Sequence, residues 1–245
     1  MIEIIVLIFL ILAFLLWRLW RQFWLRCEHA NQVDWGGKWV NRIDGFSRLL
    51  SYRYHRLEFD PIPLPESGPA VVVANHISGL DPLLLVAAVQ RPLRFLIARE
   101  EYERFGLTWL FRRAGCIPVD RDKRPERAMR QAMEALERGE VVALFPHGGI
   151  VDPTSASKKI KGGAVRLAHN QGCKIYPAHI DGIKGVGHTL LALPLRSRAR
   201  ITALPVLDCS QYSYEECVNL LAQLLNKPLV GMAKKEEKQN DRNAD

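Results

Sequence analysis

The sequence predicts a single layered α/β domain with a largely parallel sheet, preceded by an N-terminal membrane helix. Two observations support this fold class. Short apolar runs of strand length alternate with helical patterns through the middle of the chain, which is typical of a parallel sheet covered by helices. The chain also begins with an unbroken apolar run of 14 residues, at 4–17, as expected of a helix in contact with lipid.

Length and composition are those of a globular protein. The chain has 245 residues, 48% of them hydrophobic and 24% charged, which is enough to bury a core. Its 17 glycines and 14 prolines are too few for a collagen-like or disordered chain. A mean hydropathy of −0.06 argues against a polytopic membrane protein. The composition therefore leaves one large or two small globular domains with one very apolar end.

The apolar run is predicted to be a retained membrane anchor over residues 1–26. Fourteen helical residues cover about 21 Å, less than the roughly 30 Å of a bilayer core. A spanning helix must therefore recruit the apolar residues that follow, while a shorter insertion would lie in one leaflet. A cleaved signal peptide fits poorly, because Glu3 stands where a positive charge is usual and no small-x-small site follows. The recruited residues, Leu19, Trp20, Phe23 and Trp24, alternate with arginines as in an interfacial belt.

A basic segment follows the anchor, and residues 27–56 are predicted to be a juxtamembrane helical segment. Residues 18–56 hold eight basic side chains against three acidic ones. Such a bias places this side of the helix in the cytoplasm, next to anionic lipid. A solvated helix face is the alternative, whereas nucleic acid is disfavoured because no recognition motif accompanies the charge. The pair Gly36 and Gly37 is the candidate hinge between anchor and domain.

The predicted α/β domain spans residues 57–230. Its strands are expected at 70–75, 93–98, 116–119, 141–145, 174–180 and 200–206. Helices are expected at 38–55, 82–89, 107–114, 124–138 and 163–171, and a last one at 214–226 begins with a Ser213/Glu216 capping box. Residues 231–245 are polar and charged and are predicted to be a disordered tail.

Five cysteines form an odd and sparse set, and no two stand in a C-x-x-C pair. A disulfide scaffold is therefore excluded, and we expect reduced thiols in a cytosolic compartment without a structural zinc site. The five are Cys27, Cys116, Cys173, Cys209 and Cys217.

A histidine and an aspartate follow the first predicted strand of the domain. His76 and Asp81 stand five apart on a glycine-containing turn that leads into a helix. Open α/β sheets bind ligands at this carboxyl edge, and a histidine held by a carboxylate is a common general base. Two structural alternatives remain: Asp81, followed by proline, would serve as a helix N-cap, and His76 would be a turn residue satisfied by backbone.

Three further segments follow later predicted strands. They are Gly115-Cys116-Ile117-Pro118-Val119-Asp120-Arg121, Phe145-Pro146-His147-Gly148-Gly149, and Ile175-Tyr176-Pro177 downstream of Lys161-Gly162-Gly163. Together with the NHxxxxD segment at 75–81, in this order and spacing, they resemble the glycerolipid acyltransferase family, which includes bacterial 1-acyl-glycerol-3-phosphate acyltransferases. The resemblance covers about residues 57–206.

The resemblance implies transfer of a fatty acyl group from acyl carrier protein or coenzyme A to a lysolipid hydroxyl. His76 would deprotonate the hydroxyl, Asp81 would orient His76, and Arg121 would contact the acceptor phosphate through its planar guanidinium. No cofactor is expected beyond the thioester co-substrate, and no metal. The lysophospholipid acceptor and the thioester carrier are the expected partners. A cell inner membrane location follows, with the catalytic domain on the cytoplasmic side.

One segment departs from the family pattern. Where the family usually has Phe-Pro-Glu-Gly-Thr-Arg, this chain has Phe145-Pro146-His147-Gly148-Gly149-Ile150. A charged His147, the backbone N–H groups of Gly148 and Gly149, and nearby Lys161 would then bind the phosphate. The alternative acceptors are a lysophospholipid with a head group and a lyso-aminolipid, and a non-catalytic lipid-binding protein is the third hypothesis.

Overall fold

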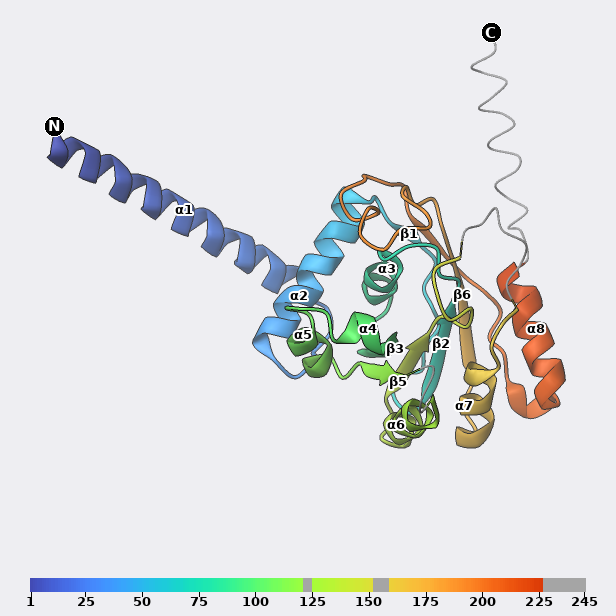
Figure 1. The fold of residues 1–245 in the computed structure, drawn as a ribbon. Helices are drawn as coiled ribbons and strands as arrows, with labels where there is room; N and C mark the ends of the chain where they lie inside the picture. The colour runs from blue at the N-terminus through green and yellow to red at the C-terminus, as the bar shows by residue number, and fades with distance from the viewer. Residues whose placement is uncertain (121–124, 152–158, 227–245) are drawn as a thin grey trace, which may run out of the picture.

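Among the residues that the computed structural model describes, 1–120, 125–151 and 159–226, a seven-stranded sheet forms the centre of the domain (Figure 1). Its order is β1-β7-β6-β2-β5-β3-β4. The strands are β1 (Glu58–Phe59), β2 (Ala70–Ala74), β3 (Leu93–Ala98), β4 (Ile117–Val119), β5 (Val141–Leu144), β6 (Ile175–Asp181) and β7 (Arg200–Ala203).

The sheet is largely parallel, as predicted. The run β6-β2-β5-β3-β4 is parallel throughout, so these strands end at one edge. β7 is antiparallel to β6, and β1 pairs in parallel with β7. All six predicted strands are present; β1 was not predicted, because two exposed residues carry no periodicity.

Helices cover both faces of the sheet (Figure 1). Along β2, Ala70, Val72 and Ala74 belong to one apolar cluster, with α3, whereas Val71 and Val73 belong to the other, with α6, α7 and α8. This alternation is the two-residue period of a strand buried on both faces. The helices are α1 (Ile2–Ala30), α2 (Lys38–Leu49), the π-helix η1 (Leu50–Tyr54), α3 (Asp81–Ala88), α4 (Arg99–Tyr102), α5 (Thr108–Arg113), α6 (Pro125–Glu137), α7 (Gly163–Gln171), the 3₁₀ turn η2 (Cys209–Gln211) and α8 (Tyr214–Asn226).

Helix α1 projects from the domain as a single rod (Figure 1). It is 29 residues long, and its most apolar window is not buried by the rest of the structure. At about 1.5 Å per residue it exceeds the roughly 30 Å of a bilayer core. The helix thus includes the aromatic residues that a spanning segment needs to recruit, although a signal sequence meets the same criteria of length and composition.

The C-terminal end of α1 packs against α2 as a helical hairpin. Gly45 allows the close approach, since a Cβ there would lie 1.7 Å from the carbonyl oxygen of Cys27. Arg42 pairs with Glu28 at 2.8 Å and covers the ring of Trp39. Gly36 lies in the connecting turn at a positive φ of 76°.

Arg48 corrects the predicted basic surface of residues 27–56. Arg48 is one of the eight basic residues of 18–56 that are predicted to face anionic lipid, but it is 1% exposed. It pairs with Asp44 at 2.8 Å and donates to the carbonyl oxygens of Ala87 and Val89 at 3.0 and 2.9 Å. Because α3 ends at Ala88, the guanidinium satisfies carbonyls at that helix terminus. Arg48 therefore joins α2 to the sheet domain and is not available to lipid.

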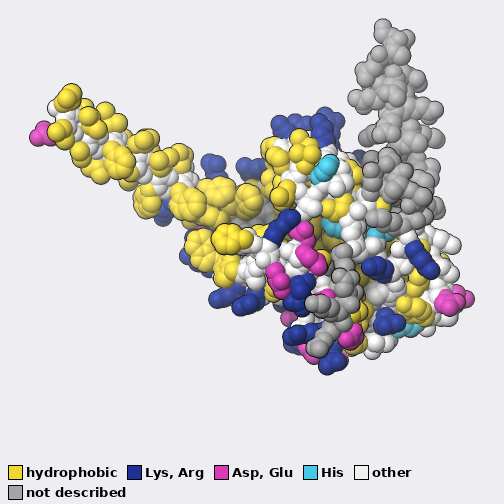
Figure 2. Space-filling model, viewed as in Figure 1, with side chains coloured by type: hydrophobic (Ala, Val, Ile, Leu, Met, Phe, Trp, Pro, Cys, Tyr) yellow, Lys and Arg dark blue, Asp and Glu magenta, His cyan; other side chains and the backbone are white. Residues whose placement is uncertain are grey.

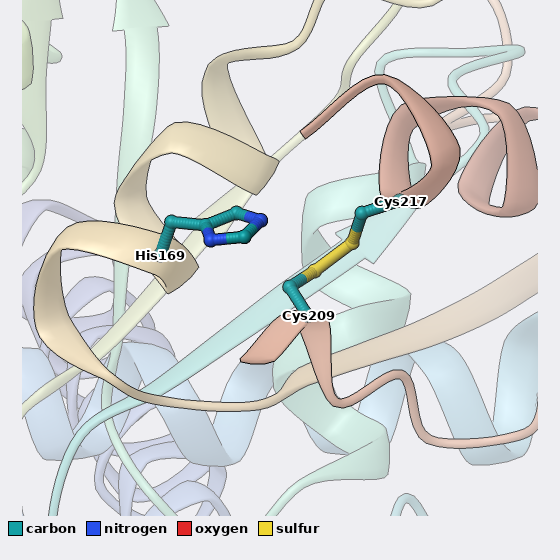
Figure 3. Close-up of side chains that lie close together, drawn as sticks. All are labelled: His169, Cys209 and Cys217. Carbon is teal, nitrogen blue, oxygen red and sulfur yellow. A yellow bond between two sulfur atoms is a disulfide. The ribbon is translucent and has the colours of Figure 1, made fainter. Parts of the chain in front are cut away.

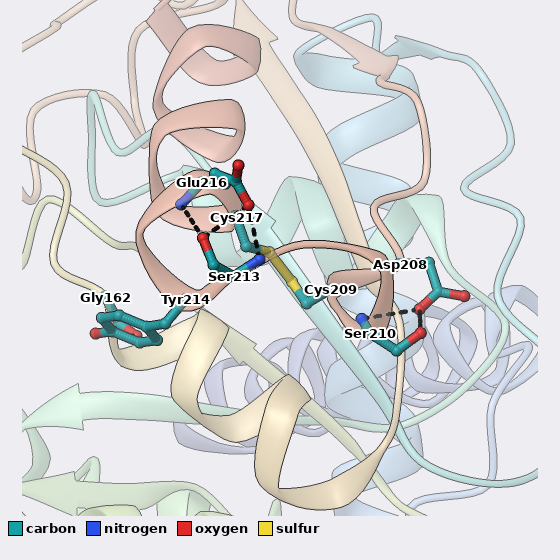
Figure 4. The surroundings of a disulfide bond; sticks show 8 residues. All are labelled: Gly162, Asp208, Cys209, Ser210, Ser213, Tyr214, Glu216 and Cys217. Carbon is teal, nitrogen blue, oxygen red and sulfur yellow. Dashed lines mark hydrogen bonds between the residues drawn. A yellow bond between two sulfur atoms is a disulfide. The ribbon is translucent and has the colours of Figure 1, made fainter.

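The predicted capping box starts α8 (Figure 4). The Glu216 carboxylate accepts from the Ser213 N–H at 2.9 Å and from the Ser213 hydroxyl at 2.7 Å. The same hydroxyl accepts from the Glu216 N–H at 3.4 Å. The predicted tail, 231–245, lies outside the described residues.

Candidate active site

The segment after β2 is anchored before it leaves the sheet. The Asn75 side chain accepts from the N–H of Ile180 at 2.7 Å and donates to the Ile180 carbonyl oxygen at 2.8 Å. Both bonds are buried, and they join the end of β2 to its neighbour β6. The next residue, His76, therefore starts the turn from a fixed position at the carboxyl edge of the sheet.

His76 and Asp81 form a direct pair. His76 Nδ1 lies 2.8 Å from Asp81 Oδ2, and the Asp81 side chain is fully buried. The same oxygen accepts from the backbone N–H groups of Ile77 at 2.6 Å and Ser78 at 2.9 Å. The Ser78 hydroxyl donates to Asp81 Oδ1 at 2.7 Å. Four donors thus hold the carboxylate at one end of a tight turn.

This network assigns the proton on the imidazole. A carboxylate held by N–H and O–H donors acts as an acceptor, so Nδ1 carries the hydrogen and Nε2 keeps a lone pair. His76 is partly exposed, with 17% of its side chain accessible. The geometry is that of a general base whose tautomer is fixed by an acid.

The N-cap alternative for Asp81 is wrong. α3 begins at Asp81 with Leu80 in the N-cap position and no side-chain cap. The carboxylate bonds backward to Ile77 and Ser78, which precede the helix, and not forward to its free N–H groups. Pro82 does stand in the first turn, as predicted from the Asp-Pro pair.

Phe145, which follows β5, supports the imidazole from one side. Its ring lies 4.1 Å from that of His76 between centroids, with 13° between the planes. The backbone N–H of Val151 also donates to the His76 carbonyl oxygen at 2.7 Å. The segment that begins with Phe145 and the histidine turn are therefore in direct contact. Sequence reasoning selected Phe145 only as part of a motif and gave no indication of this contact.

The structure brings His147, Gly148 and Lys161 together in the turn after β5. The Lys161 N–H donates to the Pro146 carbonyl oxygen at 2.9 Å. Lys161 Nζ lies 2.8 Å from where a Cβ of Gly148 would stand, and Gly148 has a φ of +74°. Glycine is thus required both by backbone conformation and by the crossing lysine. His147 is partly buried in the same turn.

The predicted backbone anion site needs one correction. The N–H of Gly148 donates to the Phe145 carbonyl oxygen at 3.0 Å and closes the turn. It is therefore not available as a donor to a phosphate. For the other groups of this turn, the N–H of Gly149, the His147 ring and the Lys161 ammonium, phosphate binding stays a prediction.

Arg121 lies outside the described residues. The strand before it, β4, is at the sheet edge, separated from β2 by β5 and β3. Asp120, the last described residue there, has its Oδ2 3.4 Å from Arg99 Nε. Arg99 follows β3 and lies at this edge, and sequence reasoning did not select it. The only sequence signal that could have selected Arg99 is its position directly after a predicted strand.

A long connection, residues 182–199, packs on the histidine turn. The N–H of Gly187 donates to the Ile77 carbonyl oxygen at 2.9 Å, and the N–H of Gly79 donates to the His188 carbonyl oxygen at 3.2 Å. A Cβ on Gly79 would lie 1.8 Å from the Thr189 carbonyl oxygen. The sequence contains no periodic pattern in this connection, so its role beside the site was not predicted.

The prediction of reduced thiols is wrong for one pair. Cys209 and Cys217 form a disulfide between η2 and α8 (Figure 4). His169 of α7 lies beside it (Figure 3), and the possible ligand atoms of the three side chains lie within 4.8 Å of one another. Sulfurs bonded to each other are not thiolate ligands, so this cluster in its present state does not form a zinc site.

The three free cysteines are poor nucleophiles. Burial raises the pKa of Cys116 to about 12 and that of Cys173 to about 11, and it also raises the pKa of Cys27. Thiolates are the reactive form, so these side chains stay protonated near neutral pH. Among the described residues, the His76–Asp81 pair is the group at the sheet edge best arranged for proton transfer.

Comparisons with known proteins indicate the family of this chain. The model of the Acyltransferase family matches residues 58–181. A "Probable 1-acyl-sn-glycerol-3-phosphate acyltransferase" of Mycoplasma pneumoniae is 34% identical over 134 residues, 49% of this chain and 48% of the relative. The protein of the same name from Mycoplasma genitalium is 32% identical over 124 residues, 48% of this chain and 46% of the relative. The chain thus matches about half the length of these curated relatives.

A solved structure shares the fold. The crystal structure of the 1-acyl-sn-glycerophosphate acyltransferase PlsC from Thermotoga maritima has a TM-score of 0.62 and 21% sequence identity, covering 78% of each chain. The family match spans half of the sequence, including the histidine turn and the turn after β5. The chain therefore belongs to the acyltransferase family, as its resemblance to the glycerolipid acyltransferases indicated.

Proposed function

We propose that this protein is a membrane-associated acyltransferase that moves a fatty acyl group from a thioester to the free hydroxyl of 1-acyl-glycerol-3-phosphate. The product is phosphatidic acid, an intermediate of phospholipid synthesis. The observation that carries the proposal is the His76–Asp81 pair. The two side chains are 2.8 Å apart at the sheet edge of a domain that belongs to the acyltransferase family. The names of the two Mycoplasma relatives support this acceptor.

The geometry supports a single-displacement reaction. His76 Nε2 takes the proton of the acceptor hydroxyl as its oxygen attacks the thioester carbonyl carbon. Asp81 stabilises the imidazolium that forms. The tetrahedral intermediate collapses with cleavage of the C–S bond, and the imidazolium returns its proton to the departing thiolate. The new C–O bond replaces the C–S bond, so no enzyme nucleophile is needed.

Acceptor selection is assigned to the turn after β5 and to Arg121. The Lys161 ammonium beside Gly148 supplies a positive charge at that turn, and His147 adds a second one when protonated. Arg121 is proposed as a bidentate phosphate ligand on the family pattern. Since His147 stands where the family usually has glutamate, a lysophospholipid with a head group or a lyso-aminolipid is the second candidate acceptor.

An acceptor panel tests the reaction. The purified full chain in detergent is assayed with acyl-acyl carrier protein and with acyl-coenzyme A, on 1-acyl-glycerol-3-phosphate, lysophosphatidylglycerol, lysophosphatidylethanolamine and a lyso-aminolipid. We expect the highest kcat/KM on 1-acyl-glycerol-3-phosphate. Higher activity on another acceptor would support the second candidate. No turnover on any acceptor with either donor would support the non-catalytic hypothesis.

Membrane association is proposed through α1. Its exposed apolar surface and the aromatic and basic residues of its second half fit a bilayer and its interface. We place the domain on the cytoplasmic side because the basic residues follow the apolar run. Carbonate-washed membranes should retain the full chain and release a chain lacking residues 2–17.

A further inference from the structure

An open basic cavity lies beside the connection between β6 and β7. It has a volume of about 350 Å³. Four of its six lining residues are cationic, and the side chains of these four make no ion pair or hydrogen bond with the part of the chain that the structure describes. Like charges gathered without counter-ions favour binding of an anion. The lining residues are Arg56, Gly182, Lys184, Arg196, Ser197 and Arg198.

The backbone around this cavity is specifically built. Arg196 and Arg198 are exposed and alternate with buried Ser197, so both arginines point outward from one extended segment. The Ser197 hydroxyl accepts from the N–H of Lys184 at 3.0 Å and joins the two sides of the connection. Gly182 has a φ of +73°, and a Cβ there would lie 2.1 Å from the Arg198 carbonyl oxygen. The backbone that carries Lys184, Arg196 and Arg198 is therefore fixed beside the cavity.

Exposed leucines lie next to the cations on the same connection. Leu190, Leu191 and Leu195 are 60%, 49% and 36% exposed. The backbone carbonyl carbon of Leu191 approaches the Cβ position of Gly185 to 3.2 Å, so the leucine segment folds back beside Lys184. Figure 2 shows hydrophobic and basic side chains together over this part of the domain. A soluble anion would contact the cationic side chains but not the exposed leucines, whereas a lipid surface can bind both the cations and the leucines.

We propose that residues 182–199, with Arg56, dock on the headgroups of anionic phospholipids. The cations surround a lipid phosphate, and the leucines enter the boundary between headgroups and acyl chains. This contact is separate from α1 and stands whether or not His76 is catalytic. Because the N–H of Gly187 bonds to the Ile77 carbonyl oxygen, the docked segment is also fastened to the histidine turn. Docking therefore holds that turn at the lipid surface.

Hydrogen exchange of the full chain tests the docking. The protein is placed in nanodiscs of phosphatidylcholine alone or with phosphatidylglycerol, so that α1 inserts in both and only the headgroup charge differs. We expect amides within 188–198 to exchange roughly fivefold more slowly with phosphatidylglycerol, the effect of about one cation near an anionic surface. Arg196→Gln/Arg198→Gln should lose this difference. Arg127→Gln/Arg130→Gln, on exposed positions of α6, should keep it.

Three results would overturn the proposal. Equal exchange in the two lipid compositions would show that headgroup charge does not matter. Retention of the difference in the Arg196/Arg198 variant would place the contact elsewhere. Slower exchange caused by inorganic phosphate or coenzyme A in phosphatidylcholine discs, without an effect of phosphatidylglycerol, would assign the cavity to a soluble phosphate compound. A melting curve matching that of the wild type confirms that the variant is folded.

Discussion

The ring of Phe145 lies nearly parallel to the imidazole of His76, with 4.1 Å between centroids and 13° between planes. The two residues follow β5 and β2, which are hydrogen-bonded neighbours in the sheet. The imidazole is thus held on its face by an aromatic ring and on its Nδ1 edge by Asp81. Both contacts restrict rotation of the ring, which favours a fixed direction for Nε2.

Phe145→Leu should lower kcat while leaving the fold intact. Leucine keeps an apolar side chain but removes the flat surface against the imidazole. Since aromatic pairs contribute about 0.5–1.5 kcal/mol beyond burial, we expect a loss of roughly twofold to tenfold. Phe95→Leu is the matched control, because Phe95 contacts Phe145 at 6.1 Å between centroids. An equal loss of kcat in both variants would indicate general packing and not support of His76.

His76→Ala should reduce acyl transfer by about 10²–10⁴-fold, the usual contribution of a positioned general base. The side chain is partly exposed and its ring is not part of the core, so the melting temperature should change little. Initial rates and thermal unfolding of the same preparation measure both. Wild-type turnover in the variant would refute the mechanism. A large loss of stability would instead support a structural role for His76.

Asp81→Asn should preserve the turn but not the activity. The amide oxygen can still accept from the backbone N–H groups of Ile77 and Ser78, so the backbone geometry is retained. The lost charge no longer stabilises the imidazolium, and we expect a fall in kcat of about 10²-fold or more. The double variant His76→Ala/Asp81→Asn should be no slower than His76→Ala, because the pair acts as a unit. Multiplicative losses would show that Asp81 acts independently of His76.

Acid should destabilise the protein through His55. This ring is fully buried, and burial lowers the pKa of His55 below its usual value of about 6.5. The unfolded chain therefore binds more protons than the folded one below about pH 6.5, and stability falls as pH drops into that range. Denaturant unfolding at pH 7.5 and 5.5 should show a smaller loss for His55→Leu than for the wild type. Parallel losses would assign the acid sensitivity to other groups.

Reduction of the Cys209–Cys217 disulfide should destabilise the packing of α8. The bond closes a loop with a sequence separation of 8, for which loop entropy corresponds to about 2–3 kcal/mol. Dithiothreitol should lower the unfolding free energy of the wild type by this amount. It should not change the unfolding free energy of the Cys209→Ser/Cys217→Ser variant. Identical curves with and without the reductant would show that the bond adds no stability to the folded chain.

Much of the fold and the site was determined by the sequence alone. The six longer strands, the main helices and the capping box at Ser213 were predicted, because periodicity, propensity and caps act over a few residues. The pair of His76 and Asp81 was also predicted, since both lie within one turn after a strand. Local chemistry was sufficient to select these residues and to place them at the edge of a parallel sheet.

Other features were decided only by the tertiary structure. The burial of Arg48 depends on the end of α3, about 40 residues away in the chain. The contact of Phe145 with His76 depends on β5 lying beside β2. The packing of residues 182–199 on the histidine turn depends on the path of the chain between β6 and β7. The structure also decided between the two roles considered for Asp81, because its carboxylate bonds to the turn before α3 and not to the helix. The local sequence does not encode which distant groups will pair with a charged side chain or stack on a ring, because those partners are selected by packing of the whole chain.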